Sequence, residues 1–107
     1  MANNKIIIEV ITDEQHVPEK IKWEAPQIME KGESKSVALA LWDEKENNTM
    51  RMDIWTKNMT TDEMKKFLLQ NIITFCDTYE RATSDAALSN KIKQFIIQTA
   101  KEENVLK

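Results

Sequence analysis

The sequence predicts an α+β protein in which a three-stranded antiparallel sheet is followed by two helices, in the order β-β-β-α-α. In three short segments of the first half, apolar residues recur with the period of two that is typical of strands. After Thr60 the period changes to 3.6, as in amphipathic helices. A length of 107 residues and a hydrophobic fraction of 41% suit a single domain that spans residues 1–107.

The three expected strands are Lys5–Thr12, Ser36–Lys45 and Thr49–Thr56. The last two strands form a hairpin that is closed either by an Asn47-Asn48 type I′ turn or by a turn centred on Glu46-Asn47. Both registers keep the same side chains on a common face, because they differ by a shift of two residues, which is one full period of the alternation along a strand.

Residues 13–34 are expected to be irregular, because Pro18 and Pro26 both interrupt strand pairing. Ile21 and Trp23 are the side chains that would anchor this segment on the core. Gly32 marks a turn before the next strand.

The first helix is expected to begin after a capping box, Thr60-x-x-Glu63, and to bury a stripe that includes Phe67 and Cys76. The second helix runs from about Asp85 to Glu103. We expect the two helices to pack together on one face of the sheet. That face carries the better apolar alternation: Ile6, Ile8, Val10, Val37, Leu39, Leu41, Met50, Met52 and Ile54.

Composition excludes several classes of function. One Cys and one His cannot form a Cys/His zinc site, one Gly cannot form a glycine-rich phosphate loop, and a net charge of −3 argues against nucleic acid. The apolar run Val37–Trp42 is too short for membrane insertion, and the start lacks a signal-peptide pattern, so we expect a cytoplasmic protein. Cys76 fits a buried structural thiol and His16 a solvated surface residue. No catalytic, cofactor-binding or metal-binding residue is predicted, and the chain is not expected to be an enzyme.

The sheet face that points away from the helices is the candidate interaction face. It carries Ile7, Ile11, Ala40, Trp42 and Trp55. Two tryptophans beside isoleucines form an apolar patch that is unfavourable in water. Residues 13–34 could fold over it, a second copy of the chain could cover it as a homodimer, or a partner protein could bind it.

Five blocks of the sequence together resemble the GldC family of gliding motility proteins from gliding bacteria of the Bacteroidetes type. The blocks are Val17-Pro18-Glu19-Lys20-Ile21-x-Trp23, Leu41-Trp42-Asp43, Met52-Asp53-Ile54-Trp55-Thr56-Lys57-x-Met59, Asp62-Glu63-Met64-Lys65 and Asp77-Thr78-Tyr79-Glu80-Arg81-Ala82-Thr83. The resemblance spans nearly the whole chain and implies a cytoplasmic protein of gliding motility with no known enzymatic activity. It supplies no catalytic or ligand residues.

Two functions are therefore in competition. The first is a non-enzymatic accessory protein that binds protein partners of the gliding machinery or of the secretion system associated with it. The alternative is a small cytoplasmic chaperone or adaptor for exported proteins. It rests on a layout similar to that of the export chaperone SecB, which is an analogy at the level of the fold alone.

Overall fold

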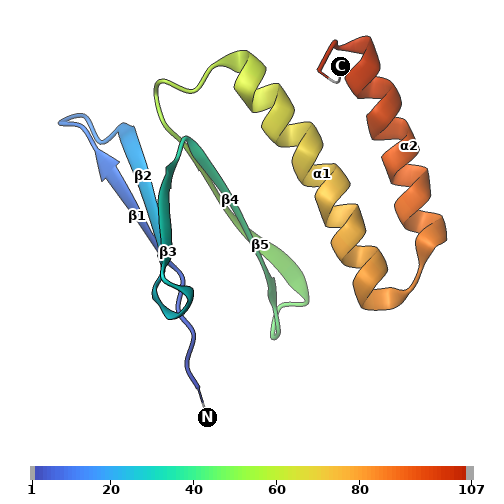
Figure 1. The fold of residues 1–107 in the computed structure, drawn as a ribbon, viewed down its shortest axis with the longest axis horizontal. Helices are drawn as coiled ribbons and strands as arrows, with labels where there is room; N and C mark the ends of the chain where they lie inside the picture. Colours follow the sequence, from blue (N-terminus) through green and yellow to red (C-terminus); the bar gives the residue numbers. More distant parts are fainter. Residues whose placement is uncertain (1, 106–107) are drawn as a thin grey trace. The chain divides into compact units, whose positions relative to one another are not determined.

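The computed structural model describes residues 2–105 and confirms an α+β protein with antiparallel sheets and two helices (Figure 1). The chain divides after Met59 into two compact units, the first with the strands and the second with the helices. The elements, in order, are β1 (Ile7–Thr12), β2 (Pro18–Ala25), the 3-10 turn η1 (Pro26–Ile28), β3 (Glu30–Ser34), β4 (Ser36–Asp43), β5 (Asn48–Trp55), α1 (Thr61–Thr83) and α2 (Ala86–Glu102).

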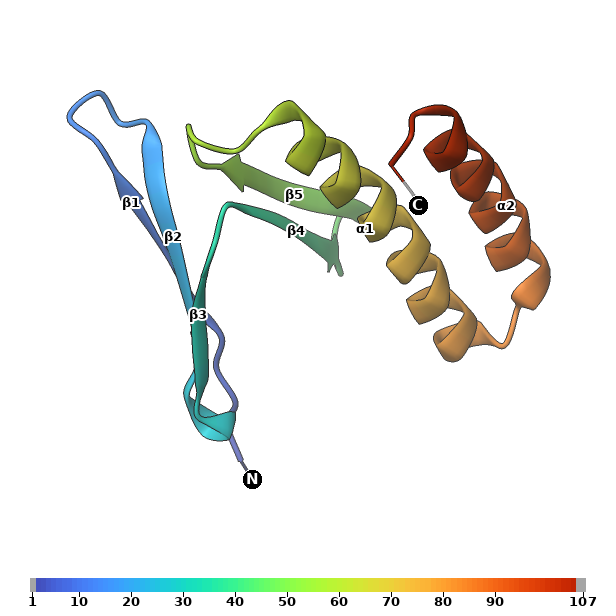
Figure 2. The same ribbon diagram turned by 45° about the horizontal axis from the view of Figure 1, so that its top comes forward.

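The first unit contains two sheets rather than the single three-stranded sheet that the sequence predicts. One sheet has the order β1-β2-β3, and the other is the β4-β5 hairpin (Figures 1 and 2). The predicted pairing of the first strand with the later two is therefore wrong, since β1 pairs with β2 instead. Lys35 alone separates β3 from β4, and its carbonyl accepts the N–H of Thr56 at 2.8 Å, which continues the β4-β5 pairing by one residue into this bend.

The prediction of an irregular segment over residues 13–34 is also wrong, because the two prolines lie at the ends of β2 and not inside it. Pro18 is the first residue of β2 and lies opposite Thr12, where the register shifts, while Pro26 opens η1 just after the strand ends. A proline in these positions removes no interior ladder hydrogen bond. Gly32 lies inside β3 rather than in a turn.

One face of the three-stranded sheet is apolar and contains the best-buried side chain of the first unit. Ile21 has no exposed surface and lies between Val10 of β1 and Ser34 of β3. In the next row, Trp23 lies opposite Gly32. Ile21 and Trp23 thus anchor this segment as expected, although they do so as neighbouring inward positions of a strand.

The β4-β5 hairpin is confirmed, and its pairs Leu41–Met50 and Leu39–Met52 lie on one face as predicted. Neither predicted turn occurs, because the loop has four residues, 44–47. Asp43 stabilises this longer loop, because its Oδ2 accepts the backbone N–H of Lys45 at 3.1 Å and that of Glu46 at 2.6 Å. The last loop residue then takes a positive φ, as an asparagine readily does.

The second unit is a helical hairpin whose boundaries follow the capping signals in the sequence. Thr60 caps α1 by accepting the N–H of Glu63 at 3.1 Å, and the Glu63 carboxylate accepts the Thr60 N–H at 2.9 Å, so the capping box is confirmed. Ser84 ends α1 in a left-handed conformation, and Asp85 caps α2 through the N–H of Leu88.

Small and branched side chains form the contact between the two helices. Leu69, Ile96 and Ala100 are buried together, and the buried Ser89 hydroxyl donates to the Cys76 carbonyl at 3.1 Å. This hydrogen bond satisfies a hydroxyl that would otherwise be unpaired inside the hairpin. The packing of the helices on a sheet face stays a prediction.

Candidate interaction surfaces

The structure divides the predicted interaction face between two sheets. Ile7 and Ile11 lie on β1, in the three-stranded sheet, whereas Ala40, Trp42 and Trp55 lie on the β4-β5 hairpin. Within each sheet these residues share a face, as their sequence parity predicts. Their common membership of one surface across both sheets was part of the sequence prediction and stays a prediction.

The two tryptophans of the hairpin are highly exposed and lie at its opposite ends. Trp42 is 68% exposed and pairs with Thr49 beside the loop, while Trp55 is 56% exposed and pairs with Ser36 at the open end. Six residues of strand separate these two positions, which corresponds to about 20 Å. The hairpin therefore offers two apolar contact points rather than one continuous patch.

An ion pair lies between the two tryptophans on the same face. The Arg51 guanidinium donates to both carboxylate oxygens of Asp53, at 2.9 and 3.2 Å. This hydrogen bond to Asp53 is the main reason that the pKa of Arg51 is raised. A partner that contacts both tryptophans would thus have to be apolar at its two ends and polar between them.

The opposite face of the hairpin also carries large apolar side chains. Leu41, Met50 and Met52 each keep more than half of their side-chain surface in solvent, and the sequence predicts them on the helix-facing side. A two-stranded hairpin of this kind is marginally stable alone in water, so these apolar side chains favour a covering layer, which the sequence predicts to be the two helices.

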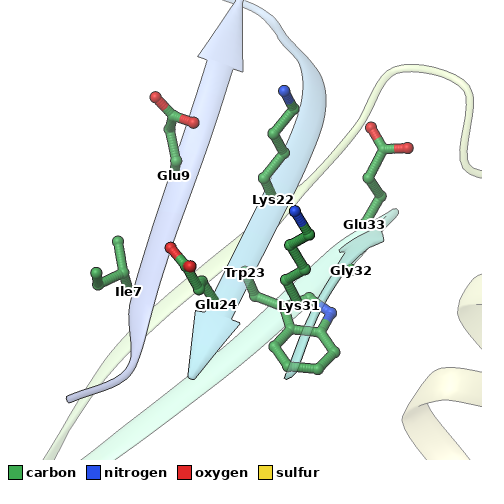
Figure 3. A pocket seen from close by; sticks show the side chains of 8 residues that line it. All are labelled: Ile7, Glu9, Lys22, Trp23, Glu24, Lys31, Gly32 and Glu33. Atoms are coloured by element: carbon green, nitrogen blue, oxygen red, sulfur yellow. The ribbon is translucent and has the colours of Figure 1, made fainter. Parts of the chain in front are cut away.

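A shallow cavity of about 520 Å³ lies on the three-stranded sheet, and most of its lining residues belong to the face opposite Ile21 (Figure 3). It is lined by Ile7, Glu9, Lys22, Trp23, Glu24, Lys31, Gly32 and Glu33. Figure 3 shows the carboxylates and ammonium groups standing on neighbouring strands rather than converging on one point.

Opposite charges face one another across the strands of this cavity. Lys22 of β2 lies between Glu9 of β1 and Glu33 of β3, and Glu24 lies opposite Lys31. Such cross-strand pairs stabilise a sheet by about 0.2–1 kcal/mol each, which accounts for these residues without a ligand. The arrangement is that of a solvated sheet face.

The strongest perturbation of a carboxylate in the first unit is also structural. Asp13 accepts the N–H of Val17 at 3.0 Å, which is the main cause that lowers its pKa, and the Lys57 ammonium at 3.0 Å lowers it further. Lys57 also binds Glu19 at 3.2 Å, and the hydrogen bond to Asp13 is the main cause that raises the lysine pKa. These contacts hold the β1-β2 turn against the end of β5.

In the helical unit, the perturbed groups stabilise the connection between the helices. The Tyr79 hydroxyl donates to Asp85 Oδ2 at 2.8 Å, which raises the pKa of Tyr79 and lowers that of Asp85. Cys76 is a free thiol and only 6% exposed, which agrees with its predicted position on the buried stripe.

Within residues 2–105 no group of three or more His, Cys, Asp or Glu side chains is placed to hold a metal ion. In the same part of the chain, neither helix combines the length and the apolar character that crossing a bilayer requires. His16, which the sequence predicts as a solvated residue, is exposed in the turn after β1.

The structure reveals one exposed feature that the sequence interpretation does not contain. Ile28 and Met29 lie in the loop between β2 and β3, and they are 65% and 91% exposed. Ile6, just before β1, is exposed beside this loop. The alternation of Ile21, Trp23 and Ala25 with charged residues is a sequence signal for strand β2 of the β2-β3 hairpin. The prolines at both ends of this segment argue against a strand and so obscure the signal.

Comparison with protein families identifies the class of protein to which this fold and these exposed surfaces belong. A family model described as gliding motility-associated protein GldC-like matches residues 18–104, which is most of the chain. The match places the chain among proteins associated with gliding motility. The chain belongs to the GldC-like family, and the resemblance predicted from the sequence blocks is confirmed. Among curated proteins and solved structures, none matches the chain.

Proposed function

We propose that the chain is a non-enzymatic, cytoplasmic accessory protein of gliding motility that acts by binding other proteins of the gliding machinery or of the associated secretion system. Membership of the GldC-like family supports a role in gliding motility. The free, buried thiol of Cys76 suits a reducing compartment.

One observation carries the proposed mode of action: the β4-β5 hairpin exposes two tryptophans on the face that the sequence predicts to point away from the helices. Trp42 and Trp55 are each more than half exposed. Burial of apolar surface contributes about 25 cal/mol per Å², and tryptophans are enriched among the residues that dominate the energy of protein interfaces. Ile7, Ile11 and Ala40 complete the proposed interaction face on the two sheets.

The test is a double variant, Trp42→Glu with Trp55→Glu, used to complement gliding cells that lack the chain. Because both side chains are exposed, circular dichroism and the urea midpoint should match those of the parent, while spreading of the cells is lost. Lys45→Glu is the matched control, since it adds charge to the exposed hairpin loop without removing apolar surface. Full spreading by the folded double variant would contradict the proposal.

The same exposed surface also supports the alternative, a chaperone or adaptor for exported chains, because unfolded polypeptides bind to accessible apolar side chains. The two functions differ in selectivity. A chaperone should suppress the aggregation of an unrelated, chemically unfolded protein at equimolar ratio, and the double variant should not. An accessory protein with a folded partner should have no such effect.

A further inference from the structure

The two hairpin loops of the first unit have the same length and the same left-handed conformation at their fourth residue, but different residue types. Four residues connect β2 to β3, and four connect β4 to β5. In both loops the fourth residue adopts the left-handed conformation: Met29 with φ 57° and Asn47 with φ 51°. The chain therefore contains its own reference for what this loop position accepts.

Asparagine suits that position and methionine does not. A left-handed conformation brings Cβ close to the backbone, and asparagine is enriched there because its short polar side chain forms local hydrogen bonds. Met29 has no such compensation, and at 91% exposure its side chain packs on nothing that would offset the strain. Its neighbour Ile28 is 65% exposed. Folding alone does not explain two exposed apolar residues at this tip.

The loop is held in one shape by hydrogen bonds to the segment before β1. The Lys5 N–H donates to Gln27 Oε1 at 2.9 Å, and Gln27 Nε2 donates to the Asn3 carbonyl at 3.2 Å. Within the loop, the Met29 N–H donates to the Pro26 carbonyl at 3.2 Å. The loop and the start of β1 thus form one ordered end of the three-stranded sheet (Figures 1 and 2). A surface that is already ordered loses less entropy when it binds.

We propose that the apolar tip, defined as Ile6, Ile28 and Met29, inserts into an apolar cleft of a folded protein partner. The preformed, convex shape of the tip favours a cleft of fixed shape. This inference rests on the proposed function, because it names a second surface through which the chain would bind a protein of the gliding machinery.

The charges around the tip favour a protein over a membrane surface. Lys5 and Lys31 are the cations of this end of the sheet, and Glu24 and Glu30 are its anions, so the rim has no excess of positive charge. Attachment to an anionic bilayer relies on clusters of Lys and Arg. A second copy of the chain fits less well, since a convex tip is not complementary to itself across a twofold axis.

The test separates the role of the tip in binding from its role in folding. Met29→Asn places at the strained position the residue that the β4-β5 loop already uses, and the urea midpoint of this variant should rise. Ile28→Ser with Met29→Asn should keep the fold and reduce spreading in cells that lack the chain. A benzoylphenylalanine at position 28 should form a cross-link in cells to one protein of distinct mass, and Met29→Asn should lower the yield about tenfold, equivalent to about 1.4 kcal/mol.

The control is the same photoreactive residue at position 45, in the other loop, which should not form that cross-link. An adduct with the mass of a dimer, or loss of binding to phosphatidylglycerol vesicles in the Ile28/Met29 variant, would overturn the inference in favour of a second copy or a bilayer. Full spreading by the Ile28/Met29 variant would also overturn it. If cells that lack the chain altogether spread normally, it is the proposed function that fails.

Discussion

Replacement of Gly32 by alanine tests how closely Trp23 is packed against the edge strand of the three-stranded sheet. An ideal Cβ at Gly32 would lie 3.0 Å from Trp23 Nε1, 3.1 Å from Cε2 and 3.2 Å from Cζ2. Favourable contacts between such atoms lie at about 3.5–4.0 Å. Three atoms of a rigid indole would therefore have to move together by several tenths of an ångström.

Two opposing effects determine the size of the change in stability. Overpacking of this kind typically costs about 1–3 kcal/mol. Alanine in place of glycine inside a strand stabilises the folded state by about 0.5–1 kcal/mol, because alanine loses less conformational freedom than glycine when the chain folds. The overlap with the indole is the larger effect, so Gly32→Ala should destabilise the protein by about 1 kcal/mol, which lowers the melting temperature of a small domain by about 4–8 °C.

A double-mutant cycle with Trp23→Leu provides the decisive assay by urea unfolding. Leucine lacks the ring atoms that the new methyl group would meet, so in this background Gly32→Ala should be neutral or stabilising. If Trp23→Leu prevents folding, Trp23→Phe serves as the second background. An equal cost of Gly32→Ala with and without the indole would refute the reasoning, because the strain would then not come from Trp23.

Three further predictions follow from contacts in the two units. Thr60→Ala should destabilise the protein by about 1 kcal/mol in urea unfolding, because the first turn of α1 loses the acceptor for an N–H. Ile21→Ala should cost about 2–5 kcal/mol, since the side chain is fully buried and leaves a cavity, and an unchanged midpoint would show that Ile21 is not core. The lowered pKa of Asp13 contributes stability that is fully present above the unfolded value of about 3.9 and is lost as the pH falls through the folded value. The difference in urea midpoint between the parent and Asp13→Asn should therefore be constant from pH 7 to pH 5 and shrink below pH 4.

Local signals in the sequence were sufficient for the helices and for the β4-β5 hairpin. The capping box at Thr60 and the polar residues around Ser84 marked where each helix begins or ends, because those signals act within one turn of backbone. The strand β2 was not predictable by the same reasoning. A proline excludes the interior of a strand but permits its first residue, and Pro18 occupies that permitted position. Without β2, the nearest partner for β1 was missing, and β1 was assigned to the wrong sheet.

The apolar tip could not be predicted because it depends on that same hairpin. Pro26, Ile28 and Met29 read as part of an irregular segment until β2 and β3 are paired around them. A left-handed backbone conformation is predicted from sequence where Gly or Asn occurs, and methionine at position 29 gives no such signal. Methionine is a residue type that the left-handed conformation does not favour. For that reason the conformation of position 29 could not be predicted from the sequence, and for the same reason we propose that Met29 has a role in binding.

The separation of the two hairpin tryptophans depends on the register of β4 and β5. An Asn47-Asn48 turn would place Trp55 opposite Ala40, about 7 Å along the strand from Trp42, and a Glu46-Asn47 turn would make this about 13 Å. The observed four-residue loop makes it about 20 Å. Parity is the same in all three registers, so the sequence was sufficient to place both indoles on one face. The distance between them follows from the loop length, which Asp43 sets through its two backbone hydrogen bonds. A partner surface for this face must therefore span about 20 Å, and a short linear motif of three or four residues, about 10–13 Å when extended, cannot contact both tryptophans at once.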